Sequence, residues 1–331
     1  MSVPFRAGIE AQPQNLNDGA STLRARLAEV DLTPLREGTI VFSGIGASWH
    51  ALLPSVRRLR AEGRRAFAVP APELAEASGL GDAYVLVSQS GASSELLAAL
   101  QRLHGAPIYA VSASGDGPLA QGADVWLPLG PQPDTAVSTL SYTATLQALG
   151  MLSEEILTPG GAAAWTTLGE LAQATIESSD AVAARLAEAL AGVATVDAVG
   201  SAAALASAGE TALLVREALR LPAHGEETRQ YLHGPLEAVD ERFGCILFGA
   251  GRELELARAL AGFGATVATV SDREDAAGPH AFQLPSVGDL AAPILQIIPI
   301  QLTVAHAAAA RGLPVAELRR QQDDTKAAAG R

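Results

Sequence analysis

Short apolar runs alternate with helical leucine patterns along this chain, and polar or glycine-containing turns follow several of the runs. In the first half, the runs that read as buried strands cover residues 41–44, 66–69, 83–87, 107–112 and 125–129. Residues 48–59 have helical spacing, and so do the leucines from Leu96 to Leu103. Strands that alternate with helices predict an α/β fold with a parallel sheet.

The second half repeats this order of elements. Strands are predicted over residues 196–200, 244–248, 266–271 and 282–284, and a helix that follows the first of them ends near Leu219. Pro159, Gly160 and Gly161 indicate a break between the halves. The sequence therefore predicts two three-layer αβα sandwiches, each with a parallel sheet.

A run of hydroxyl side chains separates the strand at 83–87 from the helix after it. Ser88, Gln89, Ser90, Gly91 and Ser93 lie in this turn, which we call the serine turn (residues 88–93). Free N–H groups at a helix N-terminus attract an anion, and hydroxyls can donate to it. The lysine of a nucleotide-binding P-loop is absent, so the turn predicts a single sugar phosphate. The alternative is that these serines only cap the helix.

The corresponding turn of the second half, 249–251, contains no serine, so only the first half is expected to bind phosphate. Both this turn and Gly44-Ile45-Gly46 imitate part of a dinucleotide-binding fingerprint. Trp49 and Leu254 stand where its third glycine would be, and the strand after the first turn lacks the acid that would hold a ribose. A nicotinamide enzyme is therefore a minor alternative.

Composition narrows the class of protein. The 331 residues suffice for two domains, and 48% of them are apolar. A net charge of −13 predicts a surface that repels nucleic acid. Apolar runs are shorter than a membrane span and the N-terminus has no export signal, so we expect a cytoplasmic protein without a membrane partner.

Two single residues bear on the chemistry. Cys245 is the only cysteine and lies in an apolar run, which predicts a buried core thiol and excludes both an internal disulfide and a cysteine–histidine metal site. Lys326 is the only lysine, so it is either retained for its amine or present in the tail by chance.

Several segments resemble the double-SIS (sugar isomerase) family, in the same order along the chain. These segments are 9–13, 46–51, 88–91, 137–139, 233–236, 292–294 and 299–302. The similarity is greatest to the isomerase half of glucosamine-6-phosphate synthase. It implies two SIS-type sandwiches, and we expect an N-terminal helical arm over 1–37, a phosphate-binding SIS domain over 38–160, a second SIS domain over 161–288 and a C-terminal helix and tail over 289–331.

The resemblance also implies roles for particular residues. The phosphate would be held by Ser88, Gln89, Ser90 and Ser93. Ser48 and Ser138 would lie beside sugar hydroxyls. Glu217 would move a proton between sugar carbons C1 and C2, His233 would assist ring opening in the site of a neighbouring subunit, and Lys326 would engage the open-chain carbonyl.

The residues themselves are compatible with this chemistry. One carboxylate can remove a proton beside a carbonyl and return it to the adjacent carbon through an enediol. Glu210 and Glu217 are seven residues apart, which predicts one helix face, and the leucines between them predict a buried helix. Asp323 and Asp324 favour the charged form of Lys326, so an electrostatic role and an imine both stay open.

Departures from the synthase narrow the predicted activity. No glutaminase segment or N-terminal cysteine nucleophile is present, and Leu214 and Leu140 stand where the synthase has lysines. We therefore expect a cytoplasmic homodimeric isomerase of a hexose or amino-hexose 6-phosphate. Where an amine is released, it would be of the deaminase or deglycase type. We expect no need for a metal or an organic cofactor.

Two other classes remain. One is a non-catalytic regulatory SIS protein that binds a sugar phosphate, although the first 37 residues are too short and too acidic for a DNA-binding module. The other is a structural protein in which the serine turn is only a cap.

Overall fold

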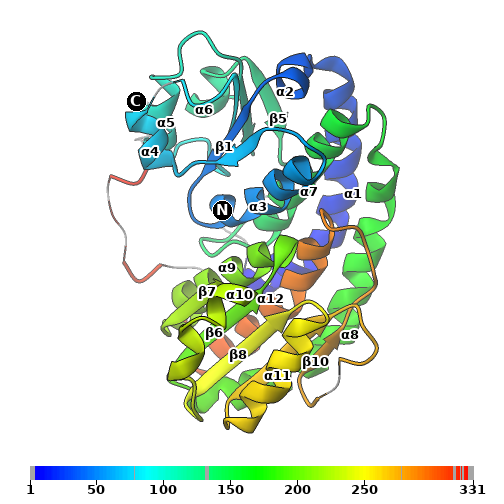
Figure 1. Ribbon diagram of the computed structural model, residues 1–331, viewed down its shortest axis with the longest axis vertical. Coiled ribbons are helices and arrows are strands. Elements are labelled where there is room, and N and C mark those ends of the chain that lie inside the picture. The colour runs from blue at the N-terminus through cyan, green and yellow to red at the C-terminus, as the bar shows by residue number, and fades with distance from the viewer. Residues whose placement is uncertain are drawn as a thin grey trace. The chain divides into compact units, whose positions relative to one another are not determined.

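The computed structural model describes residues 4–77, 79–130, 134–276, 278–315, 318–320, 322 and 324–326. The chain forms two compact units, each with one sheet (Figure 1). The first-sheet unit comprises Gln14–Gln132, Ser141–Leu168 and Arg319–Arg331. The second-sheet unit comprises Met1–Pro13, Pro133–Leu140 and Gly169–Leu318.

The sheet of the first-sheet unit has five parallel strands in the order β2-β1-β3-β4-β5. These strands are β1 (Ile40–Gly44), β2 (Ala66–Ala68), β3 (Ala83–Val87), β4 (Ile108–Ser112) and β5 (Val125–Pro128). The predicted strands are confirmed to within a residue or two at their ends. Three of them, β1, β3 and β4, are buried along their whole length, as parallel strands covered on both faces must be.

The sheet of the second-sheet unit is also parallel, in the order β10-β9-β8-β6-β7. These strands are β6 (Thr195–Gly200), β7 (Ala223–Glu227), β8 (Phe243–Phe248), β9 (Thr266–Ser271) and β10 (Ala281–Gln283). Four of them were expected. Strand β7 was not, because its sequence is polar and contains a glycine; it pairs only with β6 and lies at the edge of the sheet.

Helices flank both sheets, and the two units have the αβα layering expected of SIS domains (Figure 1). The α-helices are α1 (Phe5–Glu29), α2 (Thr33–Glu37), α3 (Ala47–Ala61), α4 (Ala71–Glu76), α5 (Ser94–Leu100), α6 (Pro118–Gln121), α7 (Leu140–Leu157), α8 (Leu168–Ala189), α9 (Leu205–Leu214), α10 (Thr228–Tyr231), α11 (Arg252–Gly262) and α12 (Ala292–Ala310). A π-helical turn, η4 (Val215–Leu219), continues α9. Short 3-10 turns cover Ala162–Thr167, Leu190–Gly192, Ala202–Ala204 and Pro235–Ala238.

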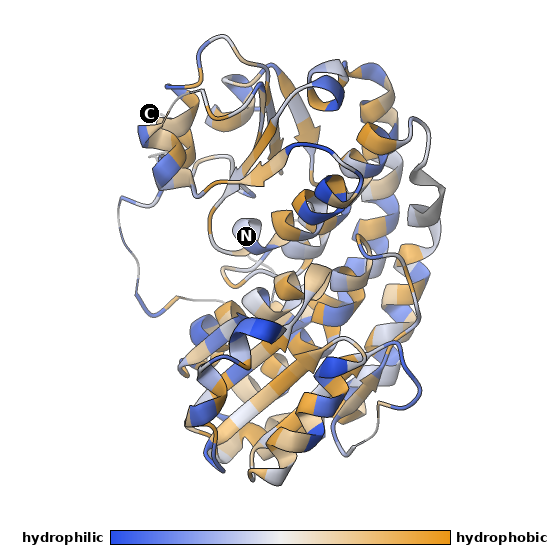
Figure 2. Ribbon diagram, viewed as in Figure 1, coloured by the Kyte–Doolittle hydropathy of each residue, from blue (hydrophilic) through white to orange (hydrophobic). Residues whose placement is uncertain are grey.

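Each sheet packs its apolar side chains against helices of its own unit. Tyr84 and Leu86 of β3 lie in one such cluster with Leu96 of α5. In the second-sheet unit, Leu247 of β8 packs with Leu256 and Leu260 of α11. Figure 2 shows the result: β8 is largely hydrophobic, whereas α11 has hydrophilic residues on the face turned away from the sheet. Each unit thus has an apolar cluster of its own between its sheet and its helices.

Helix α12 is the one described helix that is long and apolar enough to cross a membrane, judged by length and composition. In this protein 72% of the apolar stretch of α12 is buried. Ile294, Ile297 and Ile298 are fully buried, as in the core helix of a globular unit.

Cys245 on β8 is fully buried, as predicted. Burial raises the pKa of its thiol to about 12, with the Asp197 carboxylate as a second cause, so the neutral thiol persists at neutral pH.

Replacing a buried α12 residue should cost the second-sheet unit much of its stability. Ile298→Ala removes a fully buried side chain, so the free energy of unfolding should fall by about 2–5 kcal/mol in urea titrations. Phe263→Ala is the control, because Phe263 is 52% exposed and should change stability little. Equal losses in the two variants would contradict the placement of α12 in the core.

Candidate functional site

The serine turn leaves β3 and enters α5 at the carboxyl edge of the first sheet. Ser88 is buried, and Gly91 adopts a left-handed conformation with φ of +64°. A side chain there would be strained, so the turn needs glycine at this position. Backbone bonds from Ala113 to Gln89 and from Leu119 to Gly91 fix the turn to the segments that follow β4.

The turn lies at the point where the strand order of the sheet reverses. Strand β1 pairs with β2 on one side and with β3 on the other, and Gly44 is in register with Val87. The turns after β1 and β3 are therefore neighbours at one edge. Ser48, in the first turn of α3, is nearly buried and lies on this edge. Open α/β sheets bind ligands in the crevice at such a reversal.

The hydrogen bonds of these serines differ from those expected of serines that only cap helix α5. Ser93 occupies the N-cap position of α5, yet its side chain makes no capping hydrogen bond. Its hydroxyl is 2.9 Å from the Ser88 hydroxyl instead. The Ser90 hydroxyl accepts from the N–H of Ala92 at 3.3 Å, which is a local turn contact. The hydroxyls are thus grouped around the turn, and the Ser93 side chain does not cap the N-terminus of α5.

The C-terminal tail runs along the serine turn. Lys326 forms an antiparallel bridge with Ser93, and the N–H of Ser94 donates to the carbonyl of Thr325 at 3.3 Å. The Ser94 hydroxyl donates to the carbonyl of Asp324 at 2.5 Å. The only lysine of the chain is thereby placed beside the phosphate-binding candidates, with an exposed side chain. Asp323, expected to favour its charged form, lies outside the described residues.

Glu217 lies in the π-helical turn η4 of the second-sheet unit. Single π-turns in helices are frequent at functional sites. The turn ends at Arg220, which has left-handed backbone angles, and the Arg311 side chain donates to the carbonyl of Leu219 at 2.8 Å. Burial raises the pKa of Glu217 to about 7. Its carboxyl can therefore both take up and release a proton near neutral pH.

Glu210 on α9 is fully buried, and neither of its carboxyl oxygens has a hydrogen-bond partner among the described residues. Burial, followed by the charges of Glu217 and Asp134, raises the pKa of Glu210 well above its usual value. Its surroundings thus favour the neutral form of the carboxyl. The electrostatic coupling of Glu210 and Glu217 fits the expected common face, although the helix between them changes from α to π.

Ser138 lies in a loop of the second-sheet unit that Asp134 holds together. The Asp134 carboxylate accepts from the N–H and the hydroxyl of Thr139 at 2.9 and 2.6 Å. The carbonyl of Thr139 accepts from the Gln301 side chain at 3.3 Å, and Gln301 in turn accepts from Gln12 at 2.8 Å. Both glutamines are fully buried. The hydrogen bonds of Asp134 and of the buried Gln301 therefore hold the loop that carries Ser138.

His233 lies on the surface of the second-sheet unit, in the turn between α10 and the 3-10 turn Pro235–Ala238. Its backbone N–H donates to the carbonyl of Gln230 at 3.0 Å, and its side chain is exposed. Helix α10 ends at Tyr231, ahead of Gly234 and Pro235. An exposed imidazole is available to another molecule.

The glycine turn after β8 is occupied by a side chain of its own unit. A Cβ on Gly249 would lie 3.2 Å from a carboxyl oxygen of Glu253. Glu253 is buried, and its other oxygen accepts from the Thr228 hydroxyl at 2.6 Å. A buried carboxylate at this turn disfavours an anion there, which fits the prediction that only the first half binds phosphate.

The predicted site residues fall into two groups. Ser48, Ser88, Gln89, Ser90, Ser93 and Lys326 belong to the first-sheet unit, whereas Ser138, Glu217 and His233 belong to the second-sheet unit. Asp134 and the pair Gln12–Gln301 were not singled out as functional, although both glutamines lie inside segments that carry the family resemblance. Among the described residues, no cluster of His, Cys, Asp or Glu has the geometry of a metal site.

Comparison with known proteins shows which proteins the chain resembles. Residues 35–154 match the SIS domain. The glutamine–fructose-6-phosphate aminotransferase [isomerizing] of Thermococcus kodakarensis is 27% identical over 335 residues, an alignment that covers 92% of this chain and 54% of the relative. The chain thus contains a SIS domain and is homologous to the isomerizing aminotransferases. It spans about half the length of the curated relatives it matches.

Solved structures share the fold. The C-terminal domain of glucosamine-fructose-6-phosphate aminotransferase from Francisella tularensis gives a TM-score of 0.81 at 18% identity, covering 95% of this chain and 97% of that one. Glucosamine-6-phosphate deaminase from Thermotoga maritima gives 0.80 at 20% identity, covering 96% and 98%. Both comparisons support two SIS-type sandwiches.

The raised pKa of Glu217 predicts a pH-dependent stability. Between about pH 4.5, the value for an unfolded glutamate, and about pH 7, the folded protein keeps a proton that the unfolded chain releases. Ionisation of Glu217 therefore lowers stability as the pH rises through this window. Glu217→Gln lacks this effect, so its Tm should exceed that of the wild type above pH 7, by on the order of 5 °C.

The measurement is a series of thermal scans from pH 4.5 to 8. Glu188→Gln is the control, since Glu188 is an exposed residue of α8 in the same unit. A constant difference in Tm between wild type and Glu217→Gln across the pH range would show that the carboxyl is not buried.

Proposed function

We propose that this chain is a phosphosugar aldose–ketose isomerase that acts on a hexose or amino-hexose 6-phosphate, with release of an amine where the substrate carries one. Its homologues are isomerizing enzymes of sugar-phosphate metabolism, which supports a cytoplasmic enzyme. The observation that carries the proposal is the Glu217 carboxyl, because its pKa of about 7 suits a group that must pick up and return the same proton.

The phosphate is assigned to the serine turn. The grouped hydroxyls of Ser88, Ser90 and Ser93 and the positive φ of Gly91 support this role, as does the position of the turn at the strand-order reversal. Gln89 and Ser48 complete the set at the same edge of the sheet. Ser138 is assigned to a sugar hydroxyl, supported by the rigid loop that carries it.

Proton transfer is assigned to Glu217. In the open-chain sugar phosphate, the carboxylate removes the proton from C2 or C1 and gives an enediolate; the resulting carboxylic acid returns the proton to the adjacent carbon. Lys326 is assigned to the carbonyl oxygen on which the negative charge develops, where an ammonium group stabilises it. No external oxidant or reductant is needed, because the hydroxyl proton moves from O2 to O1 as the carbon-bound proton moves from C2 to C1. Where C2 carries an amine, the same transfer gives an imine at C2, and water hydrolyses its C–N bond to leave a ketone and ammonia.

Ring opening is assigned to His233 of a second copy of the chain. The exposed position of His233 in the turn after α10 supports an action outside its own unit. In a homodimer with twofold symmetry, each subunit then provides one histidine to the other.

Isotope exchange tests the role of Glu217. Glu217→Gln should lower the exchange of the C1 and C2 protons with solvent deuterium by about 10²–10⁴-fold, because the amide cannot accept the proton. Fructose 6-phosphate and glucosamine 6-phosphate serve as substrates, and NMR measures the exchange. Glu188→Gln is again the control.

Two results would contradict the proposal. Unchanged exchange in Glu217→Gln would remove the assigned base. Tight binding of sugar phosphates without turnover, on a broad panel, would indicate the regulatory class instead.

Mixing two inactive variants tests the shared site. Subunits with Glu217→Gln and with His233→Ala should each be inactive alone. After exchange of subunits, roughly a quarter of the wild-type activity should return, since half of the random dimers are mixed and each mixed dimer has one intact site. Absence of recovery in verified mixed dimers would place His233 in the site of its own subunit.

A further inference from the structure

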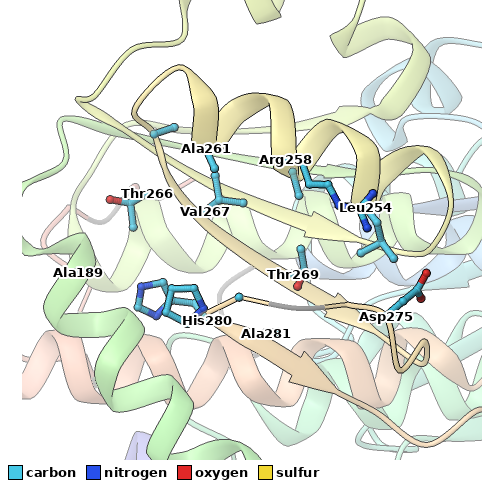
Figure 3. A pocket seen from close by; sticks show the side chains of 14 residues that line it. Ala189, Leu254, Arg258, Ala261, Thr266, Val267, Thr269, Asp275, His280 and Ala281 are labelled. Atoms are coloured by element: carbon cyan, nitrogen blue, oxygen red, sulfur yellow. The ribbon is translucent and has the colours of Figure 1, made fainter.

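A cavity of about 350 Å³ lies in the second-sheet unit, apart from the residues assigned to isomerisation. Figure 3 shows it between α11, β9 and the segment that leads into β10. Its volume is in the range of small-molecule sites, which are mostly apolar with a few polar groups. No residue of the proposed isomerase site lines it.

Two polar side-chain atoms at this cavity lack a hydrogen-bond partner among the described residues. They are Oγ1 of Thr269 and Nδ1 of His280. Thr269 is only 6% exposed, and its backbone N–H donates to the carbonyl of His280 at 3.2 Å, so the two residues are held side by side. A buried polar atom without a partner is costly, and in native proteins it usually meets a ligand or a bound water.

Small apolar side chains make up much of the cavity lining. They include Ala257 and Ala261 of α11, Ala265, and Val267 of β9. These short side chains leave apolar surface that the faces of a planar ring can contact. The two unpaired polar atoms of Thr269 and His280 can form hydrogen bonds with polar atoms on the edge of such a ring. A heteroaromatic base has polar atoms on its edge, whereas a hydrocarbon ring has none.

Two charged side chains of opposite sign complete the lining. Arg258 of α11 offers a guanidinium that binds phosphate oxygens well, and Asp275 offers a carboxylate that can accept from ribose hydroxyls (Figure 3). Asp275 is oriented by Arg273, whose side chain lies 3.2 Å away. Burial, and then the charge of Arg185, lowers the pKa of His280, so the imidazole is neutral and has one donor and one acceptor nitrogen.

We propose that this cavity binds a nucleoside monophosphate, with the base against Thr269 and His280, the ribose at Asp275 and the phosphate at Arg258. This second site is independent of the proposed isomerase function.

The experiment measures binding of AMP, GMP, CMP and UMP to the full chain by titration calorimetry. At least one should bind with one site per chain. Ala261→Trp places a large side chain in the cavity lining and should abolish binding. Ala259→Trp is the matched control, since Ala259 is an exposed residue of the same helix that does not line the cavity, and it should bind as the wild type does.

Thr269→Val keeps the shape of the side chain and removes the hydroxyl. It should weaken binding by about 10-fold while leaving the Tm unchanged or higher, because a buried hydroxyl without a partner is lost. A lower Tm with unchanged affinity would show that the hydroxyl serves the fold and would overturn the proposal.

Two further outcomes would overturn it. One is the absence of binding by all four nucleotides at millimolar concentration, which would leave the cavity to water. The other is unchanged nucleotide binding by Ala261→Trp, which would place the nucleotide outside this cavity. In that case, competition between the nucleotide and fructose 6-phosphate would identify the serine turn as its binding site. Neither result affects the test of Glu217, so the two proposals can fail separately.

Discussion

The proposed chemistry depends on holding one oxyanion at the serine turn. A phosphate that leaves water loses the hydrogen bonds of its hydration shell, and a dense set of donors must replace them. The turn between β3 and α5 brings hydroxyls and backbone N–H groups together in one place. Its shape depends on the left-handed Gly91, and its position depends on the pairing of β1 with β3. If the phosphate is anchored there, the rest of a six-carbon sugar can be positioned for proton transfer.

The chain contains the same fold twice but equips the two copies differently. In the first-sheet unit, the turn at the reversal of strand order offers grouped hydroxyls. In the second-sheet unit, the Glu253 carboxylate occupies the glycine turn after β8 and is held by Thr228. A carboxylate in this position repels a phosphate. The second copy instead provides carboxyl groups, Glu210 and Glu217, whose pKa values burial raises.

Much of the fold was predictable because buried parallel strands are short, continuous apolar runs. Strand β7 was not, since an edge strand needs no apolar sequence. The residues of the candidate site could be predicted only where a short sequence segment, such as the serine turn, carries a recognisable pattern. The buried contacts of Gln12 with Gln301 and of Gln301 with Thr139 join residues far apart in the chain, and no periodicity indicates them. The π-turn at Glu217 and the bridge from Lys326 to Ser93 depend likewise on tertiary packing. The assigned roles and the domain boundaries remain predictions.

The most direct measurement is a crystal structure of the protein soaked with fructose 6-phosphate. The account predicts phosphate density within hydrogen-bond distance of the hydroxyls of Ser88, Ser90 and Ser93. Density for the sugar phosphate at another place, with the serine turn filled by side chains of the protein, would contradict it.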